Sequence, residues 1–198
     1  MSKQPVDDAL FQHISQLVQE ARRQVQRSVN SAMVHTYWQI GRLIVEHEQQ
    51  GEHRAAYGKQ QLKHLSERLT KEFGKGFHLT NLRNMRRFYE AFPIQQTVSV
   101  ELSWSHLTHL IRLENPSARE WYMREAVSQN WSSRALERQI GTLYYERLLS
   151  SREKAPVSAE AQANTAPLAD SPKDYLREPY ILDFLNLDTR SYQYESLF

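Results

Sequence analysis

Apolar side chains recur every three or four residues over the first fifty positions, which is the spacing of one face of a helix. One apolar period occupies residues 10–25, and a second occupies residues 29–47. Gly51 follows the second period and predicts its end. The pattern therefore predicts two long helices at the start of the chain.

Two shorter helices with a tight turn between them are predicted next. Apolar residues at helical spacing mark residues 62–73, and Gly74-Lys75-Gly76 predicts a turn that closes this helix. A further helix starts near Thr80 and ends at Pro93, because proline cannot continue a helix. The predicted arrangement is helix, turn, helix.

The following residues extend this helical pattern. Residues 94–103 alternate loosely, which predicts a short strand or a wing-like loop. Helices are then predicted over residues 104–113, from an Asn115-Pro116 start to about residue 127, and from Ser132 or Ser133 to about residue 148. The predicted fold class is all-α: one multi-helix domain over residues 1–150 that contains a helix-turn-helix-like unit.

The C-terminal part differs in composition. Residues 151–172 are rich in Ala, Ser and Pro and contain no aromatic side chain, which predicts a flexible linker. Residues 173–198 carry many apolar side chains but are too few to fold alone. We expect this apolar arm to dock on the chain's own helical body or on a neighbouring copy, with a homodimer through the arm as the expected result.

Length and composition narrow the class of protein. The chain has 198 residues, 40% hydrophobic and 24% charged, as in a globular protein with one main domain. The absence of cysteine excludes disulfides, thiolate metal sites and cysteine nucleophiles, and it fits a reducing compartment. No stretch has the apolar length of a signal peptide or a membrane span. We therefore expect a cytoplasmic protein with no membrane partner.

The net charge of +2 is small, but basic residues are concentrated in one segment. Residues 59–92 hold eight Lys and Arg against three Asp and Glu, a local charge of +5. This segment is the predicted helix-turn-helix unit, the arrangement that presents a recognition helix to a groove of DNA. Its charge favours a polyanionic partner.

The helix that starts near Thr80 separates into two faces at about 100° per residue. An apolar sector holds Leu82, Met85, Tyr89 and Phe92, and the opposite face holds Thr80, Arg83, Asn84 and Arg87. Arg can donate two parallel hydrogen bonds to guanine or phosphate, and Asn can bond similarly to adenine. The candidate DNA-binding residues are Thr80, Asn81, Arg83, Asn84, Arg86 and Arg87, with Lys71 and Lys75 for phosphate contacts. A surface helix whose basic side is only solvated would show the same pattern.

Catalytic and metal-binding patterns are weak. His106 and His109 have the spacing that lets two side chains share a metal on one helix face, but no nearby carboxylate or cysteine completes a set. Metal-dependent phosphodiester cleavage commonly uses an acidic-x-Lys triplet, and none of the seven lysines has an acidic residue two positions before it. We therefore predict no catalytic residue, no metal and no cofactor.

Several short motifs follow the order of one known family. They are VNS at residues 29–31, YWQIG at 37–41, YGK at 57–59, GKGF at 74–77, NLRNMRRFY at 81–89, WSHL at 104–107, NWS at 130–132, ALERQI at 135–140 and REPYILDFLNL at 177–187. On these motifs the chain resembles the N-terminal domain of the YhcG family over nearly its whole length.

The resemblance implies a DNA-binding domain that is followed, in full-length members, by a PD-(D/E)XK nuclease domain carrying metal-binding carboxylates. We expect this chain to stop where that nuclease domain begins. One position departs from the family pattern, because His78 stands where a helix-capping Ser is expected. The departure moves the expected cap to Thr80.

Two functions remain open from the sequence. One is a non-catalytic module that binds nucleic acid, with duplex DNA the expected form, and targets a YhcG-like nuclease. The alternative is a protein-interaction or dimerisation module that makes no contact with nucleic acid. Binding to phosphates weakens steeply with salt, whereas apolar association hardly changes, so the two functions differ in their salt response.

Overall fold

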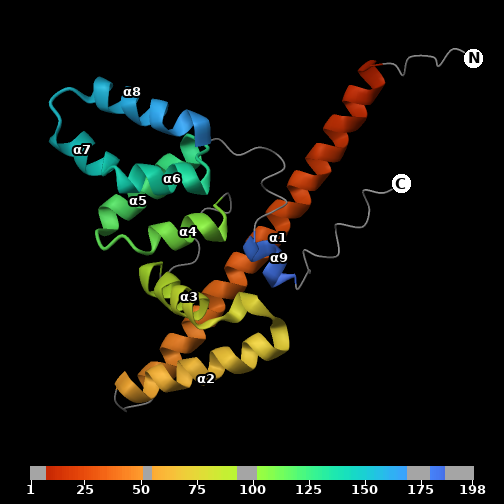
Figure 1. Ribbon diagram of the computed structural model, residues 1–198, viewed down its shortest axis with the longest axis vertical. Helices are drawn as coiled ribbons and strands as arrows, with labels where there is room; N and C mark the ends of the chain where they lie inside the picture. The colour runs from red at the N-terminus through yellow and green to blue at the C-terminus, as the bar shows by residue number, and fades with distance from the viewer. Residues whose placement is uncertain (1–7, 51–54, 93–101, 169–178, 186–198) are drawn as a thin grey trace, which may run out of the picture.

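The structure is a computed structural model that describes residues 8–50, 55–92, 102–168 and 179–185. All regular elements in these ranges are helices, which confirms the all-α prediction. Figure 1 shows one long helix running diagonally past two groups of shorter helices. The predicted strand or wing over 94–103 lies outside the described residues, except for Leu102 and Ser103.

The long helix is α1, Asp8–Gln50, and it replaces the two helices predicted over 10–25 and 29–47. That prediction was wrong because the two apolar periods lie on different sides of one continuous helix. No proline or glycine separates the periods, so nothing in the backbone stops the helix between them.

Helices lie on both sides of the predicted tight turn. The segment consists of α2 (Ala55–Phe73), the short 3-10 helix η1 (Lys75–Phe77) and α3 (Leu79–Ala91). Gly74 has a φ of 92°, a left-handed conformation that favours glycine and lets the chain turn out of α2.

The second group of helices follows: α4 (Trp104–Leu110), α5 (Pro116–Ser128), α6 (Ser133–Gly141) and α7 (Tyr144–Ser150). The predicted caps are confirmed, since the Asn115 side chain accepts from the backbone N–H of Ser117 and the Ser132 side chain accepts from that of Ala135. The single helix predicted to run to residue 148 is instead two, because Leu143 has a left-handed φ of 55° between α6 and α7.

The predicted flexible linker over 151–172 is wrong for most of its length. Residues Lys154–Thr165 form α8, and Ala166–Leu168 form a second 3-10 helix, η3. Pro156 lies in the first turn of α8, where its missing N–H has no helical partner to lose. The buried Gln139 side chain donates to the Ala161 carbonyl at 2.9 Å, and Arg147 pairs with Glu160. These contacts fix α8 on α6 and α7.

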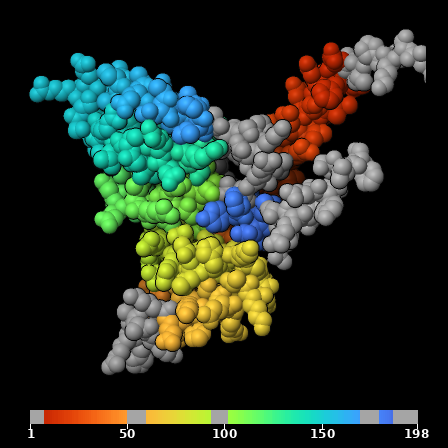
Figure 2. Space-filling view, in the orientation of Figure 1, coloured from red at the N-terminus to blue at the C-terminus, as the bar shows by residue number. Residues whose placement is uncertain are grey.

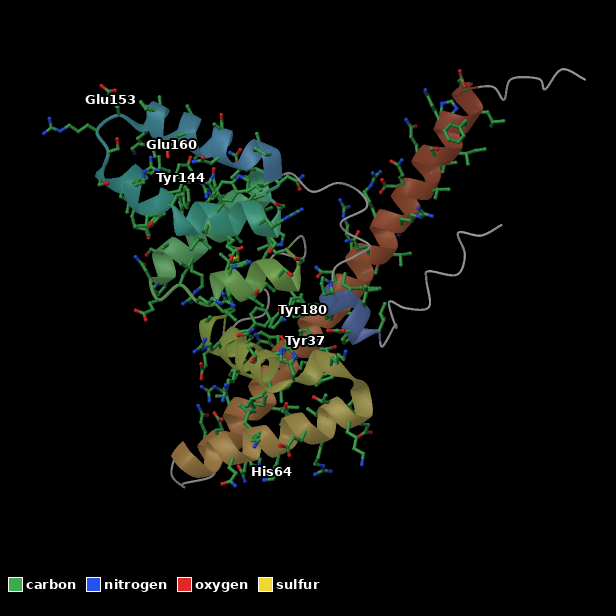
Figure 3. All side chains as sticks on the ribbon, in the orientation of Figure 1. Tyr37, His64, Tyr144, Glu153, Glu160 and Tyr180 are labelled. Carbon is green, nitrogen blue, oxygen red and sulfur yellow. The ribbon has the colours of Figure 1, made fainter. Side chains whose placement is uncertain are left out.

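The described part of the predicted arm is α9, Pro179–Phe184, and it lies on the chain's own helical body. The Phe184 ring meets the Tyr37 ring edge-on, with centroids 5.9 Å apart. Figure 3 shows Tyr180 beside Tyr37 between α9 and α1. The expectation that the arm docks is confirmed for this segment, while a homodimer through the arm stays a prediction.

The main core lies where α1, α3 and α4 meet. Tyr37 of α1, Phe88 of α3 and Trp104 of α4 are fully buried. The Trp104 ring contacts both others, with centroids 4.9 Å from Tyr37 and 5.3 Å from Phe88. This aromatic cluster holds α3 in a fixed position relative to the rest of the fold.

Candidate nucleic-acid interface

The turn between α2 and α3 is held from inside the protein. Ser66 of α2 donates to the Phe77 carbonyl at 3.1 Å, and the Asn81 amide nitrogen donates to the Gly76 carbonyl at 2.6 Å. The Asn81 amide oxygen accepts from the Trp104 indole N–H at 2.8 Å. One buried asparagine thus connects η1, α3 and α4.

Helix α3 lies directly against α1. A Cβ atom placed on Gly41 would lie 2.0 Å from the Met85 carbonyl oxygen, so the two backbones approach more closely than any other residue allows. Trp38 donates its indole N–H to the Phe92 carbonyl at 2.7 Å. These contacts press the apolar face of α3 onto α1 and turn the other face outward.

The apolar face predicted for α3 is confirmed. Leu82 and Met85 are fully buried, Phe92 is 6% exposed, and Tyr89 is half-buried against Trp38. Arg119 of α5 closes the end of this face, since its guanidinium donates to the Ala91 carbonyl at 3.1 Å and lies over the Phe92 ring. No pattern in the sequence indicates this role, because Arg119 is 28 residues away from Ala91 along the chain.

Five of the candidate residues are exposed on this unit: Lys71, Lys75, Thr80, Arg83 and Arg87. Thr80, Arg83 and Arg87 follow the three- and four-residue spacing of one side of α3. Neither arginine makes an ion pair or a hydrogen bond with another residue in the described ranges. Both guanidinium groups are therefore available to an external anion.

The other three candidates are not available in the same way. The wheel placed Asn84 on the exposed face, but the residue is only 8% exposed. On the helical wheel it lies at the edge of that face, next to the apolar sector. Asn81 is 1% exposed, and its amide is already bonded to Gly76 and Trp104.

Arg86 is half-buried and already paired. Its guanidinium lies 3.3 Å from the Glu48 carboxylate of α1 and 3.6 Å from Glu90. A charge that is neutralised by two carboxylates contributes little to the attraction of an external phosphate. Arg86 therefore ties α3 to α1.

The start of α3 differs from the expected capping. His78 occupies the N-cap position with extended backbone, and its side chain makes no capping bond to the helix. Its ring Nδ1 lies 2.8 Å from the Lys75 carbonyl instead. Thr80 was expected to take over the cap, but it lies inside the first turn and is exposed. Among the residues that the structure describes, no side chain caps the first N–H groups of α3, where the helix dipole is positive.

The histidines with metal-like spacing have other roles. His106 is 7% exposed; its Nδ1 accepts from the Ser103 N–H at 3.3 Å, and its Nε2 lies 2.9 Å from the Trp131 carbonyl. Burial lowers the pKa of His106, and it lowers the pKa of His109 for the same reason. Within the described ranges, no three His, Cys, Asp or Glu side chains come together as metal ligands would.

An apolar groove lies between α1 and α2. Its volume is about 710 Å³, and Leu43, Leu65 and Phe73 contribute exposed side chains to it. Its lining residues come from α1, α2 and η1 and not from α3, so the groove is separate from the basic side of α3. Among the described helices, none combines the length and apolar character needed to cross a membrane.

Comparison with known proteins places these features in a family context. The family described as DUF1016 N-terminal domain matches residues 13–147, which include α2, η1 and α3. A protein of Escherichia coli (strain K12) named "Putative nuclease YhcG" is 40% identical over 207 residues. The match covers 88% of this chain and 54% of that protein, so the chain spans about half the length of the curated relative it matches. No solved structure matches the chain.

Proposed function

This chain belongs to the family of DUF1016 N-terminal domains, which confirms the resemblance to the YhcG family, and from that membership we propose that it is a non-catalytic module that binds duplex DNA. In this proposal the exposed basic side of α3 contacts the DNA, and the module positions a nuclease domain on it. The module works in the cytoplasm, in keeping with a chain that has no cysteine.

The observation that carries the proposal is the pair of exposed arginines on α3, Arg83 and Arg87. Some exposed or half-buried arginines of the fold are paired with a carboxylate, for example Arg42 with Glu46 and Arg147 with Glu160. Arg83 and Arg87 instead lie one turn apart on an exposed face with no carboxylate partner in the described ranges. A rigid helix that presents two such groups suits phosphates or guanine edges in a groove of DNA.

The residues before α3 extend this surface. Lys71 and Lys75 are exposed at the end of α2 and in η1, and Thr80 is exposed in the first turn of α3. A helix N-terminus favours phosphate because its N–H groups and its dipole both point outward there. We assign phosphate contacts to this end of α3, and base or phosphate contacts to Arg83 and Arg87.

Catalysis is assigned to another part of the full-length protein. The relative named a nuclease is about twice as long as the segment matched here. No lysine of this chain belongs to an acidic-x-Lys triplet. We therefore propose that metal-dependent cleavage belongs to residues that follow this domain in full-length relatives.

The test is a binding titration with the Arg83→Ala/Arg87→Ala double variant and a labelled DNA duplex. Each lost contact should cost about 1–3 kcal/mol, so the affinity should fall by roughly 30-fold or more. The matched control is Arg138→Ala/Arg152→Ala, which removes the same charge from two exposed residues of the other helical group. A double variant of α3 that binds as tightly as the parent, with an unchanged circular dichroism spectrum, would rule out this helix as the contact.

A specific observation favours protein association as a second function of this chain, in addition to DNA binding. Six large apolar side chains are exposed along the first half of α1. They do not suit DNA, and they require a protein partner. Protein association and DNA binding use separate surfaces and are compatible with each other.

A further inference from the structure

The first half of α1 stands clear of the helical body. Figures 1 and 2 show this end of the helix projecting beyond the other helices. Its large apolar side chains are between 43% and 71% exposed, and together with the exposed Ala21 we call them the α1 stripe: Leu10, Phe11, Ile14, Leu17, Val18, Ala21 and Val25.

An unpacked helix of this length is marginal in water. Helices in proteins derive most of their stability from packing of an apolar face, and isolated segments of about 12–15 residues or fewer barely form. The remaining half of α1 cannot supply this packing, because its buried residues Met33, Tyr37 and Ile44 lie on another side of the helix. That side is about 120° around the axis from the stripe, counting about 100° per residue.

The stripe has a seven-residue repeat. With Phe11 at the first core position, Val18 and Val25 fall on later copies of that position. Ile14 and Ala21 fall on the second core position of the same repeat. This is the pattern of a helix that pairs with another helix in a coiled coil.

We propose that residues 8–24 of α1 pair with the same residues of a second copy, antiparallel and about a two-fold axis level with Gln16. This register sets Phe11 opposite Ala21 of the second copy and Ile14 opposite Val18 of the second copy. Phe11 and Ile14 then each meet a smaller side chain, and the stripe from Leu10 to Ala21 is covered. Leu17 of one copy flanks the core and lies beside Leu17 of the second copy.

Charge selects the antiparallel orientation. Asp8 and Arg22 are exposed, lie two repeats apart and occupy the same flanking position. In the antiparallel register, Asp8 of each copy meets Arg22 of the other, which gives two symmetric ion pairs. The repeat has a second flanking position, on the other side of the core, which holds Leu10 and Leu17. In a parallel pair, the position of Asp8 and Arg22 would meet this second flanking position of the other copy. A parallel arrangement would thus leave both charges unpaired.

A second copy also fits better than an unrelated partner. The stripe is complementary to itself in both size and charge, as a two-fold interface requires. The described part of the C-terminal arm is already packed on its own body through Phe184 and Tyr37, so α9 does not cover the stripe. The inference is independent of DNA binding, since it uses no residue of α2, η1 or α3.

The first test is sedimentation of the full chain over a range of concentrations. We expect a dimer. Ile14→Asp should raise the dissociation constant of this dimer on the order of 100-fold, because it places a charge in the core between the two helices. The matched control Gln12→Glu adds the same charge on the exposed opposite side and should leave the dimer intact. A parent chain that remains monomeric at high micromolar concentration would overturn the proposal.

A charge exchange tests the partner and the orientation together. Asp8→Lys alone and Arg22→Glu alone should each weaken the dimer roughly fivefold, because each turns two attractions into repulsions. The two substitutions in one chain should restore the parent affinity, since the pairs form again with reversed signs. Additive weakening in the double variant would contradict the antiparallel register.

The orientation can also be measured directly, because the chain has no native cysteine to interfere with labelling. Spin labels are placed on His13→Cys or Arg27→Cys, which are exposed and share one repeat position. In the antiparallel pair the two labels are displaced along the axis by about 9 Å for residue 13 and about 33 Å for residue 27, at about 1.5 Å per residue. Equal distances for the two sites would show a parallel pair and overturn the proposal.

Discussion

The close approach of α1 and α3 at Gly41 is the packing feature on which the position of the basic surface depends. In Gly41→Ala the new Cβ would lie 2.0 Å from the Met85 carbonyl oxygen and 3.2 Å from the Tyr89 Cβ. Both neighbours belong to a helix backbone or lie close to it, so the two helices must move apart by about 1 Å or more. Such overpacking costs about 1–3 kcal/mol, and occasionally more.

The substitution also has a favourable effect that must be subtracted. Alanine is better than glycine inside a helix by about 1 kcal/mol. Because the contact is with backbone and cannot relax through a side chain, we expect the upper part of the overpacking range and a net loss of about 2 kcal/mol. For a chain of this size that loss lowers Tm by about 4–8 °C.

Thermal and urea denaturation followed by circular dichroism measure this difference. The matched control is Gly141→Ala in α6, where the added Cβ has no neighbour within 4 Å. There only the helical preference acts, so stability should be unchanged or rise by up to about 0.5–1 kcal/mol. If Gly41→Ala were as stable as Gly141→Ala, α3 would not pack on α1 as described. The outward orientation of the basic side of α3 would then be contradicted as well.

Three further outcomes are expected. Asn81→Ala should lower the free energy of unfolding by about 2 kcal/mol or more in urea titrations, because Gly76 and Trp104 are left with buried unpaired groups; unchanged stability with lost DNA binding would show that Asn81 is a contact residue. Burial lowers the pKa of His106, so the unfolded chain takes up its proton more readily and stability should fall as the pH drops below about 6.5. His106→Gln should reduce the dependence of the free energy of unfolding on pH, and an unchanged dependence would contradict the assignment to His106. The chain should leave plasmid DNA intact with Mg²⁺ or Mn²⁺, and cleavage that survives repurification but disappears on mutation of one of its carboxylates would refute the assignment of catalysis elsewhere.

The periodicity of the sequence predicted most of the helices but not their connections. Apolar spacing located α2, α3 and α5, and the caps at Asn115 and Ser132 were correct because capping is a local interaction. The length of α1 was missed for a different reason. In α1 the apolar residues move from one side of the helix to another. In a sequence, such a shift looks the same whether the helix ends there or continues and packs against a different element.

Tertiary contacts decided the remaining differences. The composition of residues 151–172 indicated a linker, but an alanine-rich segment forms a helix once Gln139 and Arg147 hold it. At the candidate site, the wheel separated Arg83 and Arg87 from the apolar side correctly. It could not show that Asn84 is covered or that Arg86 is paired with Glu48, because both depend on elements distant in the sequence.

The central claim, that Arg83 and Arg87 contact DNA, is tested most directly by the salt dependence of binding. The logarithm of the association constant falls linearly with the logarithm of the salt concentration, by about 0.9 for each phosphate charge that the protein neutralises. If both arginines contact phosphates, the slope for Arg83→Ala/Arg87→Ala should be shallower than that of the parent by about 1.8. Equal slopes together with equal affinities for the two proteins would contradict the claim.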